Sequence, residues 1–421
     1  MSTRRPLLAL FAALSAMPGP VQAQTPPAPA TWLLHGGKVY LSPEQPPLID
    51  GAVLVRGDTI VGVGSRQDLQ VPPGTTVSRC SGPVLMAGFT NSHVHLLGPA
   101  WADAARRPAT QLTQRLNTML TRHGFTTAVD LGSDHTQTRA LQQRIAQGEV
   151  RGPRILTLGL PLFPDKGLPG YLDPLGPDFL ARLPQLASAE QAVNAVQVNM
   201  DAGAVGTKLF LATPRQGRVT RLPADTARAA ASATHRRGGT VVAHPTDLAG
   251  VQAAIDAGVD LLAHTTHGST TRWPATLLQQ ALQRGVSMTP TLHLMGYELA
   301  KEQARGPIVE QLIAASVQHV RDFAEAGGDI VFGTDVGYMS DDDPTGEYRL
   351  LARAGLSPMQ ILASLTTRPA ARWKDPQRGR LAAGMVADIV VLDADPADDV
   401  ANFSRVRCTI GAGKVLHEQG R

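Results

Sequence analysis

The chain has 421 residues, of which 43% are hydrophobic and 18% charged, a balance that is ordinary for a globular protein with a large buried core. The formal net charge is only +4, and no basic run or basic–aromatic pattern predicts a nucleic-acid partner. The chain has two cysteines, Cys80 and Cys408, which excludes a zinc site of the four-cysteine type.

Residues 1–23 have the pattern of a secretory signal peptide. Arg4 and Arg5 precede the apolar residues 7–17, prolines follow, and a small-x-small sequence ends at Ala23. The apolar stretch is too short to span a bilayer comfortably, and no later segment offers ~18 uninterrupted apolar residues. We therefore expect export to a periplasm or beyond, with no membrane association after signal cleavage. Cleavage removes Arg4 and Arg5 and no acidic residue, which lowers the net charge from +4 to +2.

The two ends of the remaining chain have similar, β-rich sequences. Residues 24–31 are rich in proline and alanine and predict a disordered spacer. Short apolar segments separated by turns follow in residues 32–85 and return in residues 380–421. We expect these two segments to pack together as one small β-sandwich domain. Cys80 and Cys408 fall in its two halves, and in an oxidising compartment they could form a disulfide.

Residues 86–379 alternate apolar strand candidates with helical stretches, several of which end in glycine as helices often do. Eight strands, each followed by a helix, predict a (β/α)8 TIM barrel. An open doubly wound sheet is the alternative, but no glycine-rich phosphate loop follows the first strand. The eight candidate strands lie near His93, Val129, Leu156, Leu209, Val242, Leu262, Met288 and Val331.

Histidines and other ligand-type residues occur at the ends of these predicted strands. His93 and His95 are separated by one residue, so on a strand both side chains point to the same face and can hold one metal ion. Each such residue alone is more often a structural polar group. The active sites of barrels, however, lie at the rim formed by the C-terminal ends of the strands. Together, six ligand-type residues on one rim predict a metal site. The other four are Lys208, His244, His264 and Asp335.

Lys208 is unusual because it lies in an apolar strand, where a permanent charge is costly. Burial lowers the pKa of a lysine, and the neutral amine can then react with carbon dioxide to form a carbamate that bridges two cations. The alternative is a buried lysine that pairs with Asp335, which would leave a site for one metal ion. The sequence leaves both possibilities open.

The order His-x-His, Lys, His, His, Asp resembles the metal-dependent amidohydrolase superfamily. The segments "GFTNSHVHL", "GFTTAVDLG", "VFGTDVG" and "GRLAAGMVADIVVLDADP" are similar to its imidazolonepropionase-like branch, which includes exported Xaa-Pro dipeptidases. This resemblance covers nearly all of the chain after residue 23. It implies a catalytic barrel, a composite β domain and a hydrolase that cleaves C–N bonds.

The resemblance also implies a role for each ligand residue. Zinc is the expected metal because imidazole and oxygen ligands suit it. A water that bridges two metal ions loses a proton near neutral pH and becomes the nucleophile, and Asp335 is the expected general acid/base. One metal would be bound by His93, His95 and Asp335, the second by His244 and His264, and both by carboxylated Lys208.

The sequence says least about the substrate. Dipeptides or N-acylated amino acids fit the resemblance and the predicted export, and a substrate carboxylate would be held by arginines in the loop after the fourth strand. Alternatively, these arginines are ordinary solvated loop residues. Two histidines complete the set of candidate contacts, and the alternative for them is that they are polar loop residues. The candidate substrate contacts are Arg215, Arg218, Arg221, His267 and His293.

Three other functions stay open alongside amide hydrolysis. The same metal site would suit a hydrolase of cyclic amides or lactones, or a deaminase acting on a heterocycle. A non-catalytic binding barrel would be expected to have lost ligand residues, and none is missing from this sequence. The sequence does not decide whether the protein forms a homo-oligomer.

Overall fold

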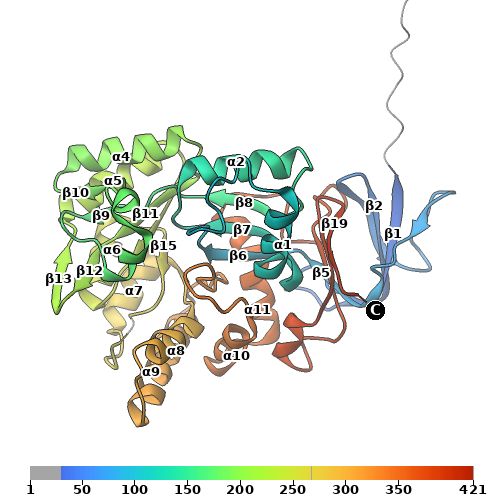
Figure 1. Ribbon diagram of the computed structural model, residues 1–421. Coiled ribbons are helices and arrows are strands. Elements are labelled where there is room, and N and C mark those ends of the chain that lie inside the picture. The colour runs from blue at the N-terminus through green and yellow to red at the C-terminus, as the bar shows by residue number, and fades with distance from the viewer. Residues whose placement is uncertain (1–29, 267, 421) are drawn as a thin grey trace, which may run out of the picture.

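The computed structural model describes residues 30–266 and 268–420, which form a mixed α/β body beside a sheet built from both chain ends (Figure 1). The predicted signal peptide, residues 1–23, lies outside the described residues. Most of the predicted spacer does too, and the first strand, β1 (Thr31–Val39), already begins at the last spacer residue.

The sheet from the two chain ends is continuous. Its order is β19-β18-β17-β5-β1-β2-β3, with β4 paired to β1, and the two ends of the chain meet where β5 and β17 pair antiparallel. Figure 1 shows these blue and red segments side by side. The predicted two-layer sandwich is therefore not confirmed, because the strands form a single sheet. They are β1, β2 (Leu48–Arg56), β3 (Thr59–Ser65), β4 (Thr76–Val77), β5 (Gly82–Ala87), β17 (Ile389–Leu392), β18 (Val406–Gly411) and β19 (Lys414–Glu418).

Alternating apolar residues give this sheet its own core. Leu34, Val53, Leu85 and Ile389 are fully buried in one cluster, and burial of such side chains stabilises the fold by roughly 1.5–3 kcal/mol each. Cys80 and Cys408 belong to the same cluster. A disulfide joins them, with their Cα atoms 5.6 Å apart.

Seven of the eight predicted barrel strands are present and run parallel. A three-stranded sheet has the order β6-β7-β8, and a four-stranded sheet has the order β11-β14-β15-β16. Backbone hydrogen bonds connect the two, including one from Val205 N to Thr157 O at 2.9 Å. The strands are β6 (Phe89–Val94), β7 (Phe125–Asp130), β8 (Arg154–Thr157), β11 (Gly206–Phe210), β14 (Thr240–His244), β15 (Leu261–Ala263) and β16 (Ser287–Thr289).

The eighth predicted strand, around Val331, is not a regular strand. It meets its neighbours through two isolated parallel bridges, Met288 with Ile330 and Val94 with Val336. Asp335 has a φ of 65°, which interrupts the extended backbone that a strand requires. The predicted closed barrel is thus present only in part, as two parallel sheets joined by single bridges and hydrogen bonds.

Helices follow most of these strands and flank them (Figure 1). Local sequence sets their ends: Ser188 caps α4, Asp247 caps α6, and Gly258 ends α6 in the left-handed conformation. Among the described residues no helix is long and apolar enough to cross a membrane. The helices are α1 (Ala109–Met119), α2 (His135–Ala146), α3 (Pro177–Leu180), α4 (Ala189–Asp201), α5 (Ala224–Arg236), α6 (Leu248–Ala257), α7 (Ala275–Gln283), α8 (Leu292–Lys301), α9 (Pro307–Glu325), α10 (Thr345–Arg353), α11 (Pro358–Leu365) and α12 (Thr367–Arg372).

Two insertions extend beyond the strand ends. One contains β9 (Phe163–Pro164), α3 and β10 (Gln185–Leu186), and the other is the packed pair α8 and α9, which projects from the body in gold in Figure 1. His293, for which the sequence left a loop position as the alternative, lies in a helix, because Thr291 has a φ of 46° and α8 begins at Leu292.

Candidate metal centre

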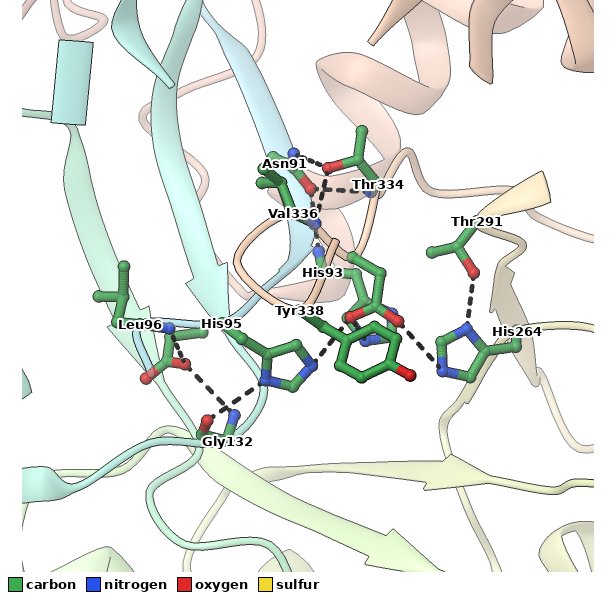
Figure 2. A network of polar contacts seen from close by, with 12 residues as sticks. Asn91, His93, His95, Leu96, Gly132, His264, Thr291, Thr334, Val336 and Tyr338 are labelled. Carbon is green, nitrogen blue, oxygen red and sulfur yellow. Dashed lines mark hydrogen bonds and ion pairs between the residues drawn. The ribbon is translucent and has the colours of Figure 1, made fainter. Parts of the chain in front are cut away.

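The first histidine pair and Asp335 are brought together by backbone pairing. His93 is fully buried on β6, and its carbonyl accepts a hydrogen bond of 2.8 Å from the Asp335 backbone N–H. The Asp335 Oδ1 atom then lies 3.4 Å from His93 Nε2 and 3.0 Å from His95 Nε2. Figure 2 shows His93, His95 and His264 converging on one point. The two histidines thus share one carboxylate oxygen.

His264 is held in a defined orientation by Thr291. The Thr291 hydroxyl donates to the Pro290 carbonyl at 2.8 Å, so it accepts from the His264 Nδ1–H at 2.6 Å. This tautomer directs the lone pair of His264 Nε2 toward Asp335 Oδ2, which lies 3.8 Å away. A histidine that binds a metal through one nitrogen is commonly fixed through the other in this way.

His244 and Lys208 complete the set from the neighbouring strands. His244 is the last residue of β14, and its ring lies 4.8 Å from that of His264 and 4.9 Å from that of Phe210. Lys208 is 1% exposed on β11, and burial lowers its pKa to about 7, although the charge of Asp335 acts in the opposite direction. The described side chains include no direct ion pair between Lys208 and Asp335.

Ionisation favours metal binding at this cluster. Burial lowers the pKa of His93 well below its ordinary value, which keeps the ring neutral and its nitrogen available as a ligand. Burial acts to raise the pKa of Asp335, but its interactions with the His93 and His95 rings outweigh burial and hold that pKa below its usual range. Burial acts to lower the pKa of His95, but the hydrogen bond and charge of Asp335 raise it. The cluster therefore presents a carboxylate and neutral imidazole at neutral pH.

The residues fit a divalent metal ion. Within the described part of the chain, neither ring nitrogen of the buried His93 has a hydrogen-bond partner, which is costly unless another group binds there. His93, His264 and Asp335 each offer one ligand atom, all within 4.8 Å of one another. Two ligand atoms that each lie ~2.0–2.1 Å from a tetrahedral zinc ion are roughly 3.3 Å apart. The Asp335 Oδ1 atom lies at similar distances, 3.4 Å and 3.0 Å, from the Nε2 atoms of His93 and His95.

A cavity of about 460 Å³ opens onto this cluster. His95, Lys208, His244, His264 and Asp335 lie in its floor. Lys208 lies in the middle of β11, and the other four lie at the carboxyl ends of their strands or just beyond. The β9–α3 insertion forms one wall and the α8–α9 pair forms another. This is the arrangement expected of an active site in such a fold.

The three loop arginines do not line this cavity in the described structure. Arg215 makes a two-pronged ion pair with Asp173 at 3.0 Å, and Arg221 makes one with Asp247 at 2.6 Å. Arg218 is exposed on β13 (Arg218–Arg221). Their placement does not support a role in holding a substrate carboxylate, because two of the guanidinium groups already bind local carboxylates and none lies among the lining residues.

His293 is not brought to the cavity either. The Nε2 atom of His293 lies 3.1 Å from Asp341 Oδ2, and His293 is absent from the described cavity lining. His267 lies outside the described residues.

Three site residues escaped the sequence analysis: Thr291, Glu298 and Tyr338. The Tyr338 hydroxyl donates to Glu298 Oε1 at 2.8 Å and accepts from Lys301 Nζ at 3.1 Å. Figure 2 shows the Tyr338 ring beside the histidine cluster. Tyr338 follows Asp335 by three residues, and this closeness in sequence was the one signal that could have indicated it.

Comparisons with known proteins agree with this fold. Ochratoxinase from Aspergillus niger is 23% identical over 398 residues, spanning 85% of this chain and 80% of the relative. Its crystal structure superposes with a TM-score of 0.77 at 19% identity, covering 93% of this chain and 97% of that one. A Xaa-Pro dipeptidase with bound methionine in its active site gives a TM-score of 0.78 at 20% identity, covering 93% and 100%. At these identities the structural likeness shows the fold.

Family membership rests on a broader match. The model of the amidohydrolase family matches residues 84–416, from β5 through the barrel strands and into β19. This match includes the candidate metal cluster, and it confirms the resemblance of the strand-end motifs. The chain belongs to the amidohydrolase family.

Proposed function

We propose that this hydrolase cleaves amide C–N bonds with the help of bound divalent metal ions. The family supports hydrolysis, and the observation that carries the metal dependence is the convergence of His93, His95 and His264 on Asp335 in a buried cluster. That cluster lies in the floor of a cavity large enough for a small molecule.

The proposed ligand set has two halves that share one bridging residue. Lys208 would bridge them after reacting with carbon dioxide, and its pKa of about 7 supports this because a large neutral fraction of the amine is present near neutral pH. When bound, divalent metal ions lower the pKa of water and polarise a carbonyl group. One half is His93, His95 and Asp335, and the other is His244 and His264.

Asp335 would move the proton during the reaction. Its low pKa means that it enters the cycle as a carboxylate, which can accept a proton from the attacking water. Asp335 would then pass that proton to the leaving nitrogen. The leaving amine then departs protonated, and Asp335 returns to its ionised form.

The surroundings support a small-molecule substrate of the N-acylated or dipeptide class in an extracytoplasmic compartment. The cavity walls are mostly apolar, which suits an N-acyl or aromatic group. The signal-like residues 1–23 and the Cys80–Cys408 disulfide support export, since disulfides persist in oxidising compartments.

The experiment is a hydrolysis screen of protein purified with bicarbonate. Dipeptides, N-acyl amino acids, lactones and aminated heterocycles would each be tested with zinc, manganese or cobalt, and again with a chelator. We expect amide cleavage that the chelator abolishes and added metal restores. Turnover of lactones or heterocycles without turnover of any amide substrate would contradict the proposed amide hydrolysis. Full activity in the presence of a chelator would contradict the proposed metal dependence.

A further inference from the structure

The floor and the walls of the cavity differ in the charged residues that they carry. Apart from the ligand residues in the floor, Glu298 and Glu302 are the charged residues among the described lining. Both lie at the C-terminal end of α8, the first inside it and the second directly after it. Both charged residues of the described wall are therefore acidic.

The rest of the wall is apolar and aromatic. Phe163 and Phe210 stack with their ring centroids 4.5 Å apart, and Tyr171 meets Tyr338 edge-on at 5.2 Å. From α8, the buried Met295 faces the same cavity. Such a surface gains free energy by burying a bulky apolar or aromatic group of a substrate.

The negative charge of Glu298 is only weakly compensated. Its Oε1 atom accepts the hydrogen bond of Tyr338, a neutral donor, and the ammonium group of Lys301 lies 3.7 Å away. The Lys301 side chain is 51% exposed, and an exposed ion pair of this kind is strongly screened by water and salt. Glu298 thus keeps a negative potential on the cavity wall.

No arginine balances this charge in the described lining. Arg215 and Arg221, the nearest sequence-predicted anchors for a carboxylate, bind Asp173 and Asp247 instead. A substrate carboxylate beside α8 would lose its hydration and meet a like charge, which disfavours binding.

We propose that the substrate has a bulky apolar group and no free carboxylate beside α8, and that Glu298 favours a positively charged group there. This inference rests on the proposed amide hydrolysis and narrows its substrate class to N-acyl amides and dipeptide derivatives that present no free carboxylate to α8. Glu298 acts as a specificity-determining residue, since it lines the cavity and is not one of the proposed metal ligands.

The test uses three substrates that share one aromatic N-acyl amide bond and differ in a single group on the amine side: a carboxylate, a primary amide or an ammonium group. We expect kcat/KM to rise in that order, with about tenfold between the carboxylate and the primary amide, as about 1.4 kcal/mol of discrimination would give. The isosteric variant Glu298→Gln should remove most of the ammonium preference, chiefly through KM. Raising the salt concentration should weaken the preference in the wild-type protein.

Two further variants keep the test specific. Glu302→Gln should reduce the preference in the same direction, which covers the case that Glu298→Gln folds poorly. Glu310→Gln on α9 should leave the order unchanged, because Glu310 is exposed, pairs with Arg353 and does not line the cavity in the described structure.

The outcomes separate the inference from the proposed function. Preference for the carboxylate substrate, or an ammonium preference of unchanged size in the folded variants at α8, would overturn the inference and leave amide hydrolysis standing. If metal-loaded protein hydrolyses none of the three, amide hydrolysis fails, and calorimetric binding of the same compounds decides the inference. Tighter binding of the carboxylate than of the ammonium compound would then overturn it.

Discussion

Two cavities of similar size lie at opposite ends of the same parallel strands. The site cavity, of about 460 Å³, opens at the carboxyl ends, where β14 finishes in His244. The opposite cavity, of about 510 Å³, lies at the amino ends, where β14 and β16 begin with Thr240 and Ser287. Size alone therefore does not distinguish a functional site from a structural hollow.

The difference lies in how charged groups are compensated. In the opposite cavity most of the charged groups form local ion pairs, as with Arg380 and Glu44 at 3.6 Å or His235 and Asp260 at 2.9 Å. Arg372 and Lys374 instead donate to backbone carbonyl groups. In the site cavity, Lys208 is buried without a direct carboxylate partner among the described residues, and its pKa falls to about 7. Strongly perturbed buried groups in a cleft indicate function, whereas local ion pairs indicate structure.

The largest expected effect comes from the same substitution in both cavities. Lys208→Arg should lower kcat/KM by roughly 10³-fold, because arginine stays charged and cannot form a carbamate. Lys374→Arg is the matched control, since Lys374 lines the opposite cavity and donates to the Gly238 carbonyl. That variant should keep activity within about twofold of the wild type, as expected for a surface substitution.

Short carboxylates should also partly restore the activity of Lys208→Ala, because acetate or propionate can supply the missing oxygen ligands. Kinetics with and without propionate measure this. Full activity in Lys208→Arg would show that the lysine does not bridge metal ions, and would favour a one-metal site.

A smaller loss should follow removal of the Thr291 hydroxyl. Thr291→Val keeps the side-chain shape but takes away the acceptor that fixes His264 Nδ1, and such a change typically costs 10–100-fold in metal affinity or activity. Thr291→Ser retains the hydroxyl and should stay near the wild type. Zinc affinity measured by competition with a chromophoric chelator compares the two. Equal affinities would mean that the hydroxyl does not position His264.

Burial of Lys208 should cost stability when metal and bicarbonate are absent. Its folded pKa of about 7 lies below the unfolded value of 10.5, so the unfolded chain binds more protons between these pH values and stability rises with pH across that window. The free energy of unfolding of Lys208→Met should therefore exceed that of the wild type by a few kcal/mol at pH 7, because each unit of pKa shift corresponds to about 1.4 kcal/mol. This difference should be smaller at pH 9.5. Urea unfolding at both pH values measures it, and an equal advantage at both would contradict the account.

The smallest effect is expected in the opposite cavity. Arg380→Gln removes a half-exposed ion pair with Glu44 and should change the free energy of unfolding by about 1 kcal/mol or less, with activity unchanged. A loss of activity comparable to that of Thr291→Val would mean that the opposite cavity takes part in function, and the contrast between the two ends would fail.

The metal ligands could be predicted from sequence because they follow strand periodicity. His93 lies on β6 and His95 directly follows it, two residues apart as expected for one face of a strand. Lys208 lies within an apolar strand, and His244, His264 and Asp335 each end or follow an apolar run. The parts that sequence missed depend on tertiary placement or special backbone angles. Thr291 and Asp335 have positive φ values, which start α8 early and interrupt the eighth strand. Neither residue type predicts this conformation.

The contacts of the loop arginines were also not predictable from the sequence. Arg215 and Arg221 were correctly placed in the loop after the fourth strand, but that loop folds into the β12 (Ala212–Arg215) and β13 hairpin. Their carboxylate partners, Asp173 and Asp247, come from other segments of the chain. Contacts between distant segments are not visible in local patterns, so the composition of the cavity walls could not be predicted.

The most direct measurement is the metal content of protein purified with bicarbonate and zinc, taken together with its activity before and after chelation. The account predicts about two zinc ions per chain and loss of hydrolysis on their removal, with recovery when zinc is returned. A chain that binds no zinc and remains fully active in chelator would contradict it.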